Sequence, residues 1–135
     1  MVNWKVLFEF CENNNWEKLK TVLETFDDVN EKDPKTGWTL LSVSAYNHSL
    51  ECVKLLLDHK ANINTVSNNG TSVLMYAKTK VLENRNFDYL DFLIENGADI
   101  FLKDKFGKDI LDYVKEKGDK EMIEYFTFKM RENSK

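Results

Sequence analysis

The residues of this sequence that could do chemistry are few and scattered. Two histidines, His48 and His59, and two cysteines, Cys11 and Cys52, are the groups best suited to acid–base, nucleophilic or metal chemistry at neutral pH. No CxxC pair or Cys/His cluster occurs, and the sequence lacks a nucleophile elbow, a phosphate-binding loop, an HExxH motif and a glycine-rich dinucleotide loop. We therefore predict no catalytic residue, no metal site and no cofactor, and a protein that is not an enzyme.

The same four side chains have structural explanations. His48 stands where a helical pattern breaks, and His59 ends the following helical stretch, where a cation is favoured by the helix dipole. Cys11 and Cys52 interrupt apolar runs, which favours buried, reduced thiols and a cytoplasmic location. The acidic residues, with Asp91 and Glu124 as examples, fall between apolar positions and are expected to form a solvated face.

Charge and length exclude further classes of function. The net charge of −4 and the pI near 5.2 argue against a nucleic-acid surface, which needs clustered Lys and Arg. No apolar run approaches the roughly 20 residues of a membrane span, and the start, MVNWKVLFEF, lacks the pattern of a signal peptide. The 135 residues suffice for one compact domain. We expect neither nucleic acid nor membrane as a partner.

The elements that position the surface residues come as a repeated unit. Gly37, Gly70 and Gly107 are 33 and 37 residues apart. The stretch GWTLLSVS, which begins at Gly37, recurs 33 residues later as GTSVLMYA, and LLLDHKANIN, which begins at Leu55, recurs 37 residues later as FLIENGADIF. A fixed period of this length indicates a stack of similar units, of which the chain holds about four.

Each unit is predicted to be a pair of short helices. In the second copy Leu50, Val53, Leu56 and Leu57 follow a helical stripe, and a polar connection rich in Asn, Ser and Gly comes after it. One such hairpin cannot bury its apolar surface alone, whereas four stacked hairpins share a continuous core. The helix of the first copy is expected from Asn3 to Asn13. The fold class is therefore all-α.

These units resemble ankyrin repeats. The resemblance is carried by GWTLLSVS, VKLLL and ANIN in the second copy and by GTSVLMYA and NGADI in the third, and the fourth copy keeps four positions of the pattern: Asp104, Gly107, Leu111 and Gly118. It implies a single ankyrin-repeat α-solenoid. The expected units are an N-terminal capping repeat, a repeat, a repeat with a four-residue insertion, and a C-terminal capping repeat with a tail: 1–31, 32–64, 65–101 and 102–135.

The units depart from the family pattern in two ways. The family's proline is replaced by Leu40, Val73 or Ile110, and its bracing histidine by Ser42, Met75 or Asp112, so we expect less rigid repeats. The four extra residues of the third copy fall between Ala77 and Phe87 and are expected to lengthen the turn between its two helices. Such a turn is either neutral or a place where function collects.

The resemblance also implies a partner-binding site, a concave groove formed by the connecting fingers and the first helix of each unit. Carried over by position, the candidate partner-binding residues are Lys35, Trp38, Tyr46, Asn47, Asn68, Asn69, Thr71, Thr79, Lys80, Lys105, Phe106, Lys108, Glu116 and Lys117. Asn13, Asn14 and Thr36 belong to the same surface.

Two features of this set bear on the partner. Trp38, Tyr46 and Phe106 are expected to be exposed, where aromatic side chains anchor interfaces; alternatively, Trp38 and Phe106 tuck under the adjacent finger. The lysines of the set outnumber its one acid, Glu116, which favours a partner with an acidic surface; alternatively, they are ordinary solvated lysines.

The sequence thus predicts a protein-interaction module, monomeric when free, that inhibits or scaffolds a partner protein through its concave groove. The alternative is a bacterial immunity protein or antitoxin that neutralises a cognate toxin, or a secreted effector. It applies if the source is bacterial, and it rests on the small size of the stand-alone array. The excess of lysine over arginine and the frequent asparagine indicate an AT-rich genome.

Overall fold

The computed structural model describes residues 2–134, and these residues form four helical hairpins. Its helices are α1 (Trp4–Glu12), α2 (Trp16–Leu23), α3 (Leu40–Tyr46), α4 (Leu50–Asp58), α5 (Val73–Asn84), α6 (Phe87–Glu95), α7 (Ile110–Lys117) and α8 (Lys120–Asn133). The described residues contain no strand, only an isolated bridge between Val66 and Ser72. The all-α solenoid predicted from the sequence is confirmed.

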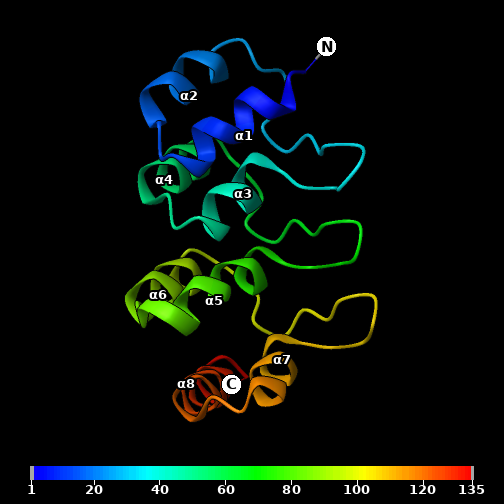
Figure 1. Ribbon diagram of the computed structural model, residues 1–135, viewed down its shortest axis with the longest axis vertical. Helices are drawn as coiled ribbons and strands as arrows, with labels where there is room; N and C mark the ends of the chain where they lie inside the picture. Colours follow the sequence, from blue (N-terminus) through cyan, green and yellow to red (C-terminus); the bar gives the residue numbers. More distant parts are fainter. Residues whose placement is uncertain (1, 135) are drawn as a thin grey trace.

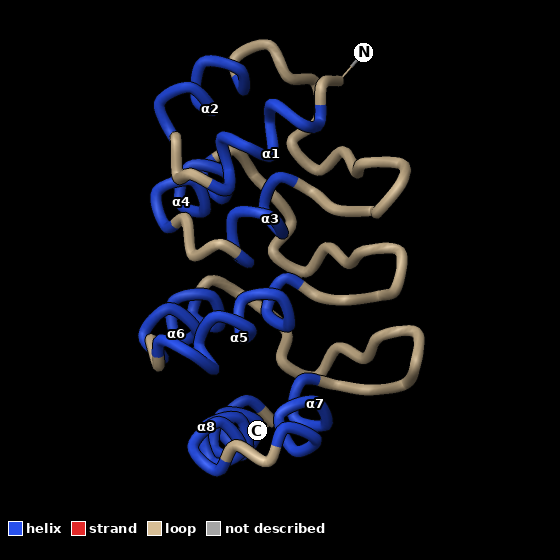
Figure 2. The backbone as a smooth tube through the Cα atoms, viewed as in Figure 1, coloured by secondary structure: helices blue, strands red, loops and turns tan. Residues whose placement is uncertain are grey.

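The hairpins stack in chain order along the long axis of the molecule (Figure 1). The first helices, α1, α3, α5 and α7, form an inner column, and the second helices form an outer column beside it (Figure 1). Three long loops project on the side of the inner column, one above another (Figure 2). We call them finger 1 (residues 31–38), finger 2 (65–71) and finger 3 (102–108). We propose to divide the chain at the four units given above, since each boundary falls between one hairpin and the next.

Each finger is closed by the same pair of backbone hydrogen bonds. In finger 1 the N–H of Asp33 donates to the carbonyl of Trp38 at 2.9 Å, and the N–H of Gly37 donates back to Asp33 at 2.7 Å. Gly37 has a φ of 76°, and a Cβ there would lie 2.6 Å from the backbone nitrogen of Asn68 in finger 2. The spacing of the glycines therefore reflects a left-handed turn that must also pass close to the neighbouring finger.

The outer helices bury the stripe predicted from the sequence. Leu56 in α4 and Leu93 in α6, 37 residues apart, are both fully buried, as are Val53 and Leu90 on the same helices. They belong to one core cluster that runs through all four hairpins. The prediction that Leu56 and Leu93 pack into the core is confirmed.

Asparagine side chains link successive hairpins in the stretches of chain that follow the outer helices. Asn30 accepts a hydrogen bond from the N–H of Asn62 at 2.6 Å. Asn64, 34 residues after Asn30, accepts one from the N–H of Asp99 at 2.8 Å. The repeated Val-Asn and Ile-Asn endings are thus polar links between units.

A left-handed residue lies between the two helices of every hairpin: Asn14, His48, Arg85 and Gly118. Three of these side chains reach the next hairpin. Asn14 accepts the N–H of Cys52 at 3.1 Å, the Nε2 of His48 lies 2.9 Å from the carbonyl of Ala77, and Arg85 donates to both carboxylate oxygens of Asp119 at 3.0 and 2.6 Å. His48 also stacks on Tyr89 with ring centroids 4.1 Å apart, and burial lowers its pKa. These side chains are therefore engaged in packing between units.

The insertion of the third unit does not lengthen the turn, which corrects the expectation from the sequence. Helix α5 has 12 residues against 7 in α3, so the extra residues add a turn of helix. The reason is that the insertion contains no helix breaker and continues the apolar stripe. Val81 is fully buried, four residues after the buried Ala77.

Two of the substitutions for the family's histidine form capping boxes. Thr39 accepts the N–H of Ser42 at 3.1 Å, and Ser42 Oγ accepts the N–H of Thr39 at 2.9 Å. Asp109 and Asp112 make the same reciprocal pair at 2.9 and 3.0 Å. Both side chains thereby satisfy backbone donors at the start of α3 and α7.

The two cysteines are buried free thiols. Burial raises the pKa of Cys11 to about 12 and that of Cys52 to about 11. Because the thiolate is the reactive form, we expect both thiols of the native protein to react with a disulfide reagent about 100-fold or more slowly than in the unfolded chain. The reaction rate is measured by following the absorbance of the released reagent over time, with and without denaturant. Equal rates in the native and the unfolded protein would contradict the burial of the two thiols.

Candidate functional site

The concave face holds an aromatic pocket of about 460 Å³. Its lining comes from α1, α3, α5 and the end of finger 1: Phe8, Glu12, Trp38, Ser42, Val43, Tyr46, Asn47 and Tyr76. These elements are neighbours because α3 packs closely against both α1 and α5. We call this feature the aromatic pocket.

Trp38 contacts both Phe8 and Tyr76 in the aromatic pocket. Its ring centroid lies 6.3 Å from that of Phe8 and 6.4 Å from that of Tyr76, and its indole N–H donates to the Tyr76 hydroxyl at 2.8 Å. The residue remains 38% exposed. The alternative that Trp38 tucks under a finger is therefore wrong, because its contacts are with the inner helices α1 and α5.

Tyr46 forms the outer wall of the aromatic pocket. It is 41% exposed at the end of α3, and its ring stands at 87° to that of Tyr76, with centroids 6.3 Å apart. The ammonium of Lys80 lies 5.8 Å from the centroid of the same ring. Its exposure agrees with the sequence expectation.

The fingers are joined to one another by polar groups of the candidate site. Asn68 donates its backbone N–H to Thr36 and its side-chain amide to Lys35, both at 3.0 Å. Lys105 donates its backbone N–H to the carbonyl of Asn69 at 3.0 Å. These groups hold the three fingers side by side, so Asn68 has a structural role in addition to any contact with a partner.

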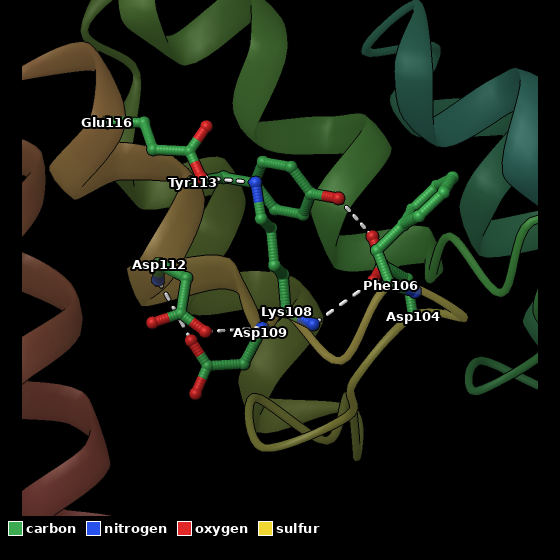
Figure 3. A network of polar contacts seen from close by, with 7 residues as sticks. All are labelled: Asp104, Phe106, Lys108, Asp109, Asp112, Tyr113 and Glu116. Carbon is green, nitrogen blue, oxygen red and sulfur yellow. Dashed lines mark hydrogen bonds and ion pairs between the residues drawn. The ribbon is translucent and has the colours of Figure 1, made fainter.

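Finger 3 is fixed by a buried carboxylate (Figure 3). Asp104 accepts hydrogen bonds from the Tyr113 hydroxyl and from the backbone N–H groups of Phe106 and Lys108. Burial works to raise the pKa of Asp104, but these donors outweigh it and lower the pKa, and the same contact raises the pKa of Tyr113 to about 12. Phe106 is left 65% exposed at the tip, so the alternative that it tucks under the adjacent finger is also wrong.

Three basic residues of the candidate set, Lys105, Lys108 and Lys117, lie toward the other end of the groove, on finger 3 and α7. Lys35 lies in finger 1 and Lys80 beside Tyr46. Lys108 pairs with Glu116 at 2.6 Å, and this hydrogen bond raises the pKa of Lys108 (Figure 3). Burial lowers the pKa of Lys78, whose ammonium lies 5.4 Å from the ring centroid of Tyr113. Lys108 is therefore less available to an acidic partner than its place in the sequence suggests.

The remaining candidate residues differ in how exposed their side chains are. Lys35, Thr79, Lys105 and Lys117 are exposed, whereas Asn47 is half-buried and donates to the carbonyl of Val43 at 2.9 Å. Thr71 is half-buried, and its carbonyl accepts the N–H of Ser67 inside finger 2.

On the outer helices, Asp91 keeps 35% of its side chain exposed, and it is also bound to the neighbouring helix. Its carboxylate accepts the Tyr125 hydroxyl at 2.6 Å and pairs with Lys129 at 3.1 Å, which links α6 to α8. Glu124 is exposed, as expected.

Five residues of the aromatic pocket were not among the sequence candidates: Phe8, Glu12, Ser42, Val43 and Tyr76. Two of them, Glu12 and Tyr76, are related by the repeat period to other residues of the pocket. Glu12 stands 34 residues before Tyr46, the distance that also separates the left-handed residues Asn14 and His48. Tyr76 stands 33 residues after Val43, the distance between the first two finger glycines. Extending the period from the candidate Tyr46 would have found Glu12, whereas Tyr76 repeats the position of Val43, which was not itself a candidate.

Within residues 2–134, no group of three or more His, Cys, Asp and Glu side chains is placed to hold a metal ion. None of the helices described is long and apolar enough to cross a membrane.

Comparison with known proteins finds one family and several relatives. The sequence model of the family described as ankyrin repeats (3 copies) matches residues 7–104. The yeast protein named "Probable 26S proteasome regulatory subunit p28" is 32% identical over 127 residues, which are 91% of this chain. The "BRCA1-associated RING domain protein 1" of Caenorhabditis elegans is 29% identical over 82% of the chain. A putative ankyrin repeat protein of Acanthamoeba polyphaga mimivirus is 30% identical over 65%.

The matched stretch is only part of each relative. It covers 52% of the length of the yeast protein, 15% of the nematode protein and 14% of the viral protein.

Proposed function

Because this chain belongs to the ankyrin-repeat family, whose repeats generally mediate protein–protein interaction, we propose that it binds a partner protein through its concave groove. The observation that carries the proposal is the aromatic pocket. Trp38 and Tyr46 are held at defined positions beside Tyr76 and yet keep more than a third of their surface exposed. Rigid, half-exposed aromatic side chains at the centre of a concave surface are typical anchors of an interface.

The charges along the groove suggest how a partner would be oriented. The aromatic pocket over α1 and α3 contains the carboxylate of Glu12, whereas finger 3 and α7 present the exposed Lys105 and Lys117. Opposite charges at the two ends of a groove favour one direction of a bound segment over the other. We propose that the acidic part of the partner lies toward α7.

The consequence of binding is proposed to be scaffolding of an assembly rather than inhibition. The yeast relative is named as a probable regulatory subunit of the 26S proteasome, and the match spans 91% of this chain. The relatives named above come from yeast, a nematode and a virus, so none of them favours the alternative of a bacterial immunity protein or effector. The two buried thiols support a reducing compartment such as the cytoplasm, and we propose that the free protein is a monomer.

A matched pair of blocking variants tests whether the groove is the binding face. Thr79 is exposed on the inner helix α5, and Thr21 is exposed on the outer helix α2. Thr79→Trp should fill part of the groove and abolish capture of the partner from an extract of the source organism, while Thr21→Trp should capture as much as the wild type. Helical circular dichroism checks that both variants fold. Capture that survives Thr79→Trp and is lost in Thr21→Trp would contradict the proposal.

A further inference from the structure

We propose that the aromatic pocket receives an arginine side chain of the partner protein. The inference rests on the proposed function, since it names the group that enters the groove, and it follows from the three kinds of group that surround the pocket. These are aromatic rings in different orientations, a carboxylate, and the carboxyl ends of two helices.

The rings form walls that meet at wide angles. Trp38 and Tyr76 stand at 85° to each other, Tyr46 and Tyr76 at 87°, and Phe8 and Trp38 at 57°. Rings in different orientations can contact a bound group from more than one side. The negative face of an aromatic ring attracts a cation within about 6 Å. The indole N–H of Trp38 is already bonded to Tyr76, so the rings are held in place before any ligand arrives.

The pocket also contains a carboxylate without a cation. Glu12 lines the pocket, is exposed, and has no ion pair or side-chain hydrogen bond within residues 2–134. Glu12 is the last residue of α1, and Tyr46 is the last residue of α3, so both helices bring the negative end of their dipoles to the pocket. The electrostatic character of this end of the groove therefore favours a positive charge and disfavours an acidic one.

One lysine at the edge acts against an incoming cation. Lys80 lies 5.8 Å from the centroid of the Tyr46 ring and does not line the pocket. Its position shows that the Tyr46 ring accepts a cation, and its charge should weaken binding of a second one. Removing the charge of Lys80 is therefore expected to increase the affinity for an arginine side chain. This change in affinity is opposite in sign to the one expected when the charge of Glu12 is removed.

Arginine fits these groups better than other side chains. Its guanidinium is planar and weakly hydrated, so it can stack on an aromatic face while it donates to a carboxylate in the same plane. An apolar side chain would leave Glu12 without a partner, and an acidic one would be repelled by it.

The test compares two small probes that differ in charge and hardly in shape. N-acetyl-arginine amide carries the guanidinium, and N-acetyl-citrulline amide replaces it with a neutral urea. Both are titrated into the isotope-labelled protein, and the indole N–H signal of Trp38, assigned with Trp38→Phe, reports binding. We expect the arginine probe to bind about fivefold or more tightly than the citrulline probe at equal ionic strength.

Three variants make the result specific to the aromatic pocket. Glu12→Gln should remove most of the preference for arginine, whereas Glu17→Gln, the same charge change on the outer helix α2, should retain it. Lys80→Gln should increase the affinity for the arginine probe. Glu12→Gln also leaves the rings in place, so a loss of preference cannot come from a collapsed pocket.

Equal affinity for the two probes, no binding of either, or a preference that survives Glu12→Gln would overturn the assignment of an arginine. These outcomes leave the proposed function standing if Thr79→Trp still abolishes capture of the partner. If the arginine preference is found and Thr79→Trp captures normally, the pocket exists but the groove is not the binding face.

Discussion

Replacing Leu56 with alanine should lower the free energy of unfolding by about 2–5 kcal/mol, the cost of emptying a fully buried leucine site. Leu56 has no exposed surface, and it lies on α4 between the hairpins on either side. In a stack where each hairpin contacts only its neighbours, the loss should spread beyond the mutated unit. Denaturant unfolding followed by circular dichroism measures it, with one transition at lower denaturant as the expected result.

Leu55→Ala on the same helix is the matched control. Leu55 is only half-buried, so its replacement should cost clearly less than that of Leu56. Leu93→Ala, at the position 37 residues later, should match Leu56→Ala within the usual spread of such measurements. A loss below about 1 kcal/mol at Leu56 would mean that the wrong face of α4 has been placed in the core.

Replacing Tyr46 with alanine should weaken binding of the partner by about 2 kcal/mol or more, roughly 30-fold in Kd, while stability stays close to that of the wild type. Tyr46 is 41% exposed and its ring contacts only neighbouring side chains of the groove. Isothermal titration with the purified partner measures the affinity. The control is Phe128→Ala, since Phe128 is an exposed aromatic residue on the outer helix α8. A larger loss of affinity at Phe128 than at Tyr46 would contradict binding through the groove.

Trp38 is a less clean probe than Tyr46. Trp38→Ala removes the hydrogen bond to Tyr76 and the packing on Phe8, so a loss of stability of about 1 kcal/mol is expected along with the loss of affinity. The affinity of Trp38→Ala for the partner therefore has to be interpreted together with the measured stability of this variant.

The fold could be predicted because the same signals recur from one unit to the next. The glycines of the fingers mark turns that need a positive φ, and the stripe through Leu56 and Leu93 marks the buried face. The course of α5 could not be predicted in the same way, because unit length alone does not say whether extra residues enter a turn or a helix. In the structure the extra residues continue the helix, because Val81, four positions after Ala77, is buried on the same face.

The candidate site was predicted in outline and not in its contacts. Tyr46 and Phe106 were expected to be exposed from their positions in the unit, and they are. The sequence does not show that Lys108 is neutralised by Glu116 or that Asp91 is held by Tyr125 and Lys129, because these pairs depend on how successive elements face each other. Glu12 was missed because the groove was carried into the first unit only at Asn13 and Asn14, and not at the preceding position that repeats Tyr46.

The most direct test of binding through the concave groove is a photo-crosslink from defined positions. A benzophenone amino acid in place of Tyr46 lies in the groove, and the same group in place of Phe128 lies on α8. We expect the partner to be crosslinked from position 46 and not from position 128. Crosslinking from position 128 with none from position 46 would contradict the account and place the partner on the outer helices.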